Sequence, residues 1–122
     1  MTVELDQILP QFEAAQIDIT IRVSTRLNVT QVAARRKVNV LVAERVSNML
    51  LADEPNLLQT PEQGWVWRVP VDLTFPSHGR VGRVGEVDVD AHCGELRYTD
   101  ALLTRMANEA RGLAQQALSP MT

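Results

Sequence analysis

The most informative stretch of this chain is Glu86–Tyr98, which reads EVDVDAHCGELRY. Val87, Val89 and Ala91 alternate with acidic residues, and a period of two is typical of a strand with one buried and one solvated face. Gly94 follows, a residue that readily adopts positive φ, and apolar residues resume after it. The stretch therefore predicts a β-hairpin with a fixed register.

A second strand pattern, the strongest in the chain, lies just upstream in residues 65–75. Together with the hairpin it predicts a three-stranded antiparallel meander over residues 64–98. Pro70 lies within this pattern and indicates an edge position or an outward-facing backbone nitrogen, because proline cannot donate to a ladder. Residues 56–64 are expected to form a polar loop before the meander.

Helical patterns flank the meander. Residues 30–52 contain neither glycine nor proline and carry apolar side chains at helical spacing, which predicts a long helix. Residues 99–118 predict a C-terminal helix by the same spacing. Further upstream, residues 17–24 alternate as a strand does, and residues 1–16 read as an N-terminal arm or short helix interrupted by a proline.

These elements together indicate one α+β domain over residues 1–122, with an antiparallel sheet of three to four strands packed on one long helix and an additional C-terminal helix. The net charge of −3 gives no general attraction to nucleic acid or to an anionic membrane. A single cysteine excludes an internal disulfide. Neither a signal peptide nor a membrane-spanning run is visible, so we expect a cytoplasmic protein.

The hairpin motif VDAHCGEL, at positions 89–96, follows a long helix and two strands and resembles the PepSY-like modules. The resemblance covers about residues 30–98, and Cys93 stands where those modules usually have threonine. It implies a cystatin-like arrangement, in which a helix lies on an antiparallel sheet. It also implies an inhibitory or regulatory role rather than an enzymatic one. Many such modules are exported or membrane-attached, whereas this sequence shows no signal for export.

Positive charge is concentrated between positions 17 and 45, where six basic residues stand against two acidic ones. Such a segment suits an acidic protein surface or DNA. It equally suits a solvated helix face, since no aromatic side chains are interleaved with the cations. A ribbon-helix-helix DNA reader also begins with a strand, but its helices are shorter than the one expected here. The basic residues are Arg22, Arg26, Arg35, Arg36, Lys37 and Arg45.

The other candidate groups lie in the meander. Glu86, Asp88 and Asp90 have the chemistry of a cation site or an acid–base pair. Their alternation favours a solvated strand face with cross-strand ion pairs to Arg68 and its neighbours. The glycine-rich run at positions 79–85 lacks the lysine and hydroxyl residue of a phosphate-binding loop.

Two small groups remain. His78, His92 and Cys93 supply three zinc ligands only if two hairpin tips meet. Trp65 and Trp67 share the apolar face of the strongest strand, where they are either core residues under the long helix or interface anchors.

The sequence contains no combination of nucleophile, base and orienting residue, so we predict neither an enzyme nor a cofactor or metal site. The leading hypothesis is a non-catalytic interaction or regulatory module that self-associates, as a homodimer, with the strand 17–24 adding to a partner's sheet. A second hypothesis is an antitoxin-type regulatory partner that uses the basic segment 22–45 to bind an acidic protein or DNA. A third is a small-ligand binder or enzyme with a pocket between the long helix and the sheet.

Overall fold

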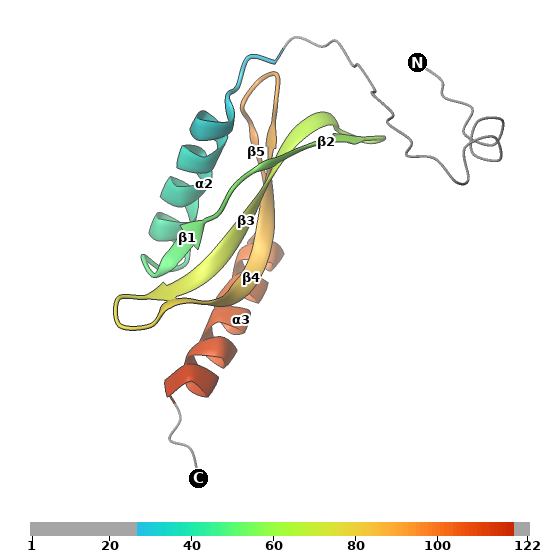
Figure 1. Ribbon diagram of the computed structural model, residues 1–122. Coiled ribbons are helices and arrows are strands. Elements are labelled where there is room, and N and C mark those ends of the chain that lie inside the picture. The colour runs from blue at the N-terminus through green and yellow to red at the C-terminus, as the bar shows by residue number, and fades with distance from the viewer. Residues whose placement is uncertain (1–26, 119–122) are drawn as a thin grey trace, which may run out of the picture.

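The computed structural model describes residues 27–118, so the expectations for residues 1–16 and 17–24 lie outside the described residues. The elements follow one another as shown in Figure 1. They are helix α2 (Gln31–Arg45), strands β1 (Leu50–Ala52), β2 (Asn56–Thr60), β3 (Gly64–Phe75), β4 (Gly79–Asp90) and β5 (Leu96–Arg97), and helix α3 (Asp100–Leu118).

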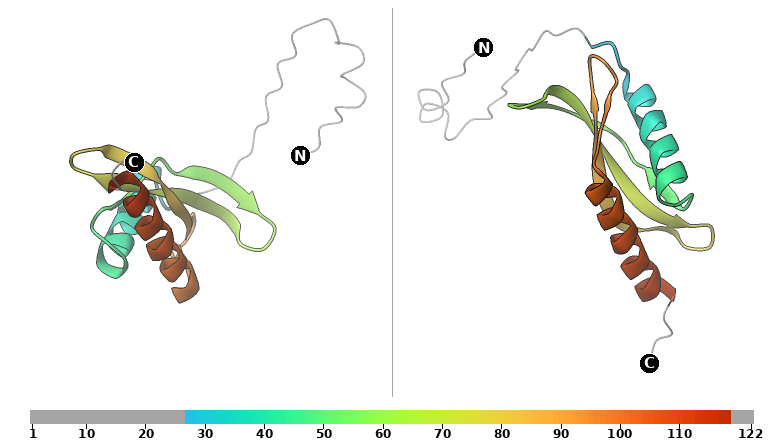
Figure 2. Two further views of the ribbon diagram at one scale, coloured as in Figure 1. Left: turned by 90° about the horizontal axis from the view of Figure 1, so that it is seen from below. Right: turned by 180° about the vertical axis from the view of Figure 1, so that it is seen from behind.

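The strands form one antiparallel sheet in the order β1-β3-β4-β5, with β2 also paired to β3. Both helices cover the same face of this sheet, as the right-hand view of Figure 2 shows. Residues 27–118 leave the other face uncovered. The predicted α+β class, the antiparallel sheet and the additional C-terminal helix are confirmed, and β3, β4 and β5 form the expected meander.

The long helix is shorter than the expected range 30–52. Helix α2 ends at Arg45, and the chain then turns to place Leu50–Ala52 in strand β1 opposite residues 71–73 of β3. Leu50 and Ala52 are buried in the sheet, so the apolar residues that fit a helical stripe also fit a short strand. Residues 50–52 form a strand and not a further turn of helix because they pair with β3.

The expected polar loop over residues 56–64 is also wrong, because it contains strand β2. This strand pairs with the start of β3, from Asn56 opposite Arg68 to Thr60 opposite Gly64. Its sequence, NLLQT, carries no alternation of apolar and polar residues that would reveal a strand.

Pro70 does not mark an edge strand, because β3 lies between β4 on one side and β1 and β2 on the other. The Pro70 carbonyl accepts a hydrogen bond from the Asp53 N–H at 2.8 Å, so the backbone of Pro70 faces the break between β1 and β2. A missing donor is tolerated at that break because neither strand pairs with this residue.

The core fills the space between the helices and the sheet, with Val38 and Val42 of α2 packed against the valines of β3 and β4. Strand β4 shifts register twice along β3, in the part that contains Gly82 and Gly85. A Cβ atom at Gly85 would lie only 2.9 Å from Cγ of Met106, and one at Gly82 would lie 3.1 Å from Cδ1 of Leu113. The glycine-rich run therefore lets α3 pack closely on β4.

Candidate interaction site

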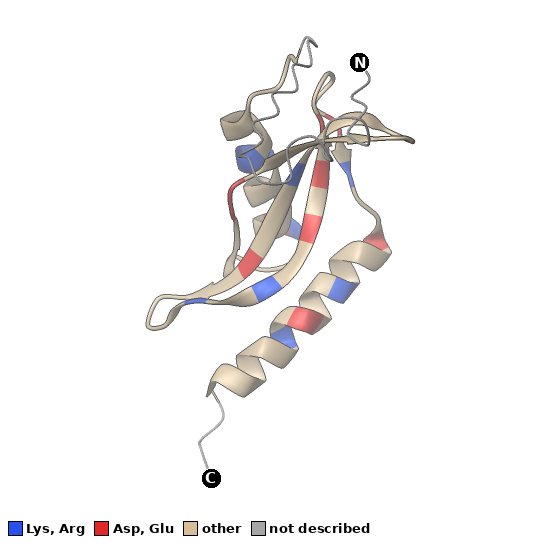
Figure 3. Ribbon diagram, turned by 45° about the vertical axis from the view of Figure 1, so that its right-hand side comes forward, with Lys and Arg blue, Asp and Glu red and all other residues tan. Residues whose placement is uncertain are grey.

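Basic and acidic residues lie along the neighbouring strands β3 and β4 (Figure 3). Ion pairs join them across the face of the sheet that the helices leave uncovered. Arg68 donates two hydrogen bonds to the carboxylate of Asp88, at 2.9 and 3.0 Å. Asp72 is only 3% exposed and accepts hydrogen bonds from Arg80 Nε at 2.8 Å and from Arg83 Nε at 3.0 Å. The expected cross-strand pairing is present, and these carboxylates are engaged within the sheet.

Asp90 holds the turn between β4 and β5. Its Oδ1 accepts the backbone N–H groups of His92 at 2.8 Å and of Cys93 at 2.9 Å, and its Oδ2 accepts from Arg97 at 3.0 Å. Gly94, at φ 79°, completes the turn. The backbone N–H of Cys93 is the main cause that holds the pKa of Asp90 well below its usual range.

Asp72 is also held in its ionised form. Burial alone would raise the pKa of its carboxyl, but the hydrogen bonds from Arg80 and Arg83 outweigh burial and lower it. A carboxyl with a lowered pKa carries no proton at neutral pH. Neither Asp72 nor Asp90 is therefore suited to act as a general acid.

The three candidate zinc ligands do not come together. His78 lies in the turn between β3 and β4, whereas His92 and Cys93 lie in the turn between β4 and β5. Strand β4 separates these turns, and its 12 residues extend over roughly 35–40 Å. In the described part of the chain, no three His, Cys, Asp or Glu side chains are grouped as metal ligands.

The basic residues of α2 serve different contacts. Arg35 Nε donates to the carbonyl of Ala52 at 3.0 Å. Arg45 pairs with Asp100 at 3.3 Å and lies 6.0 Å from the ring centroid of Tyr98. Two of the predicted binding cations thus join elements of the fold. Arg36 and Lys37 are exposed on α2, while Arg22 and Arg26 lie outside the described residues.

The two tryptophans differ in their surroundings. Trp67 packs against the core, and its Nε1 donates to the carbonyl of Val29 at 2.8 Å, which ties the start of α2 to β3. Trp65 is half-buried and lies opposite Gln59 of β2. Trp67 likewise lies opposite a residue of β2, Leu57, so both tryptophans share the face of the sheet next to this strand.

The outer edge of β1 is closed by α2. Asn39 Oδ1 accepts the Ala52 N–H at 2.8 Å, while Arg35 bonds the carbonyl of the same residue. Gln31 Nε2 then donates to the carbonyl of Pro55 at 2.8 Å. Helix side chains therefore satisfy the backbone groups that an adjacent strand would otherwise pair with.

The edge of β4 is protected in another way. Strand β5 pairs only with Asp88 and Val89, so the preceding part of β4 has one edge without a strand partner in residues 27–118. This part contains both register shifts and carries Arg80 and Arg83. Bulges and charged side chains are the common devices by which proteins discourage pairing at an edge.

Strand β2 has none of these protections, since NLLQT contains no charge and no proline and pairs with β3 without a register shift. In β3, the backbone of Pro70 faces the side of β1 and β2, whereas the Trp65 carbonyl accepts from Ala91 on the side of β4. Since strand residues alternate, Leu57 and Gln59 of β2 direct their N–H and C=O groups to the outer edge. Within residues 27–118 these groups meet no other strand.

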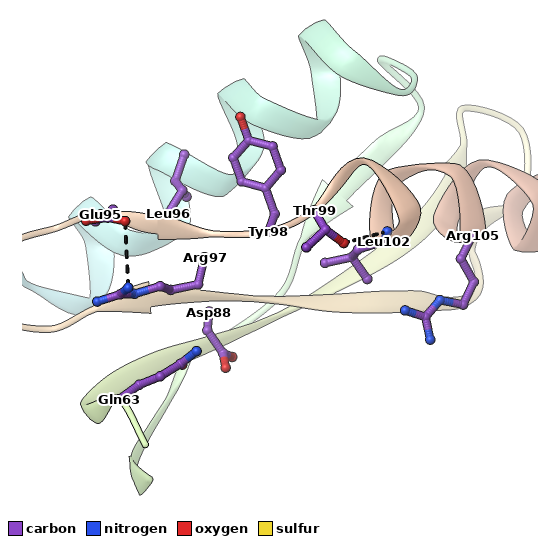
Figure 4. Close-up of a pocket in the computed structure, with 9 residues that line it drawn as sticks. All are labelled: Gln63, Asp88, Glu95, Leu96, Arg97, Tyr98, Thr99, Leu102 and Arg105. Carbon is purple, nitrogen blue, oxygen red and sulfur yellow. Dashed lines mark hydrogen bonds and ion pairs between the residues drawn. The ribbon is translucent and has the colours of Figure 1, made fainter. Parts of the chain in front are cut away.

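A surface hollow beside β5 has a volume of about 490 Å³ (Figure 4). Its two acidic side chains pair with arginines: Asp88 with Arg68, and Glu95 with Arg97 at 3.7 Å. The hollow is therefore a charge-balanced depression in the surface, and it adds no reactive group to those described above.

No helix in residues 27–118 is both long and apolar enough to cross a membrane. No protein-family model, curated protein or solved structure matches this chain.

Proposed function

We propose that this chain is a non-catalytic interaction module that associates with a second copy of itself through the outer edge of β2. The contrast between the strand edges carries this proposal. The edge of β1 is closed by Asn39 and Arg35, and that of β4 is bulged and charged, but β2 presents unprotected backbone groups at Leu57 and Gln59. Such an edge is a template for a further strand.

The chemistry of the described residues supports a binding role. The carboxylates of Asp72, Asp88 and Asp90 are engaged by arginines, and the two histidine-bearing turns lie at opposite ends of β4. Residues 27–118 bring together no nucleophile, base and orienting group of the kind that covalent catalysis requires.

The other two hypotheses receive less support. An antitoxin-type partner would use the basic segment, but Arg35 and Arg45 are engaged in contacts within the fold. A ligand pocket between α2 and the sheet would need space there, but fully buried Val38, Val42, Val69 and others fill that layer.

A relationship to the PepSY-like modules and a cytoplasmic location form part of the same proposal. In support of the former, α2 precedes the antiparallel sheet, and the motif VDAHCGEL at positions 89–96 forms the turn between β4 and β5. An interaction role agrees with the regulatory role that this resemblance implies.

Light scattering after gel filtration tests the association. The full chain should elute at twice its mass of 13.6 kDa at micromolar concentration. Gln59→Pro should give a monomer with unchanged circular dichroism, since proline removes an N–H that faces outward and leaves the bonds to β3 intact. Gln59→Ala keeps this N–H and is the matched control. A monomeric wild-type chain would overturn the proposal.

A further inference from the structure

We infer that the strand that pairs with β2 is the segment Ile17–Ser24 of the second copy, and that two copies exchange these segments reciprocally. This inference rests on the proposed function. The segment reads IDITIRVS, with four β-branched apolar residues alternating with polar ones. Strong alternation of this kind is the pattern of a strand with one apolar face.

The edge of β2 offers matching backbone groups. Leu57 and Gln59 each present an N–H and a C=O outward, so an added strand can form hydrogen bonds at two residues. No strand in residues 27–118 pairs with these four groups. A partner strand would give each of them a backbone partner without disturbing the pairing of β2 with β3.

One face of β2 offers apolar contact to the alternating segment. Leu57, which is 36% exposed, lies opposite Trp67, and Gln59 lies opposite Trp65 on the same face of the sheet. An added strand that places its isoleucines on this face would extend the apolar surface of Leu57 and Trp65. Its polar residues would then lie on the face that carries the ion pairs, next to Asn56, Leu58 and Thr60 of β2.

The length of the connection favours a second copy over the same chain. The Asn28 N–H donates to the carbonyl of Ala91, just beyond β4. The carbonyl of the next residue, Val29, accepts from Trp67 Nε1 of β3 at 2.8 Å, so a strand outside β2 lies two to three strand spacings away, about 10–14 Å. The four residue steps from Asn28 back to Ser24 reach about 14 Å only when fully extended. Pairing within one chain would therefore require a nearly straight connection, whereas pairing with a second copy carries no such restriction.

Reciprocal exchange also sets the size of the assembly. Each copy contributes one segment and one β2 edge, so a twofold arrangement uses both segments and both edges. The assembly should therefore stop at a dimer and not continue as a fibre.

Two variants test this inference, and each lacks one half of the contact. Gln59→Pro lacks the open edge of β2, and Ile19→Asp/Ile21→Asp lacks the apolar face of the segment. Ile19→Asp/Ile21→Asp places charge on the apolar face of the segment, and Thr20→Asp, on its polar face, is the matched control. The double variant should be monomeric by light scattering, while the control should remain a dimer. Because the core of residues 27–118 contains none of these positions, circular dichroism of the double variant should show a folded chain.

Mixing the variants gives the decisive measurement. The double variant keeps its β2 edge, and Gln59→Pro keeps its segment, so the two monomers should form a heterodimer through one exchanged strand. Trp65 emission should shift to shorter wavelength on mixing, because the added strand buries this side chain. A double variant that remains dimeric would overturn the inference and leave the proposed function standing. Failure of the mixed variants to associate would also overturn it, and a monomeric wild type would overturn both.

Discussion

Asn39 Oδ1 lies 2.8 Å from the backbone nitrogen of Ala52 and accepts its hydrogen bond. Four residues earlier on α2, Arg35 bonds the carbonyl of the same residue. Two side chains of one helix thereby act as the neighbour of an edge strand. This closure leaves the backbone groups of Ala52 without capacity for a further strand, and it also anchors α2 to β1.

Replacement of Asn39 by leucine should destabilise the fold. The Ala52 N–H would lose its acceptor in a residue that is 1% exposed, and an unpaired buried donor costs about 1–3 kcal/mol. Urea denaturation measures this free energy. Arg36→Ala, at an exposed position of the same helix, should change stability by less than about 0.5 kcal/mol. Equal stabilities for the Asn39 variant and the wild type would contradict the role given to this side chain.

Gly85→Ala should weaken the packing of α3 on β4. The added Cβ would meet Cγ of Met106 at 2.9 Å, and forcing a methyl group into a packed contact costs about 1–3 kcal/mol. Gly112→Ala is the matched control, because nothing lies within 4 Å of its Cβ and alanine favours a helix by up to about 1 kcal/mol. Thermal unfolding should therefore give opposite shifts for the two variants. A shift in the same direction for both would show that close approach at Gly85 is unimportant.

The sequence predicts β3, β4 and α3 well, because each is long enough for its own periodicity to show. Strands β1 and β2 escape detection for the opposite reason. Leu50–Ala52 has three residues and Asn56–Thr60 has five, too few for a period of two to stand out from a helix or a loop. Both exist because β3 offers a pairing partner, and the pairing joins residues distant in sequence.

The candidate site depends still more on long-range information. The sequence identifies Trp65 and Trp67 and the alternating segment at positions 17–24, but it does not identify β2 as the open edge. Identifying this edge requires the register of β2 with β3 and the closure of β1 by α2. The two hydrogen bonds of this closure join Ala52 to Asn39 and Arg35, which lie 13 and 17 residues earlier in the chain. The basic segment 22–45 is prominent in the sequence because charge can be read from the residue types. The contacts that Arg35 and Arg45 make within the fold cannot be read in this way.

Loss of both arginines beside Asp72 should cost more than the sum of the single losses. In Arg80→Gln, Arg83 still donates to the Asp72 carboxylate, and in Arg83→Gln, Arg80 does so. In the double variant the carboxylate keeps its burial without a cation, so its pKa should rise above the usual value. Urea denaturation of all four proteins gives the coupling energy. Strict additivity would show that the two arginines act independently.

The stability contribution of Asp90 should depend on pH. The N–H groups of Cys93 and His92 and the guanidinium of Arg97 favour the ionised carboxyl, so the pKa of Asp90 in the folded protein lies below its unfolded value of about 3.9. A depressed pKa stabilises the fold fully above the unfolded pKa, and this stabilisation is lost as pH falls towards the folded pKa. Asp90→Asn should therefore be less stable than wild type at pH 7, and the difference should shrink below about pH 4.

Urea denaturation at pH 7 and at about pH 3 checks this dependence. Glu109→Gln removes one negative charge at an exposed position of α3 and controls for the change in net charge. The side-chain amide oxygen introduced by Asp90→Asn can still accept the two backbone N–H groups, so the turn should keep its shape. The amide nitrogen cannot accept from Arg97 as Oδ2 does, so the loss should come from the charge and from this one hydrogen bond. A difference between Asp90→Asn and wild type that stays constant across this range would mean that the carboxylate charge contributes nothing to the turn.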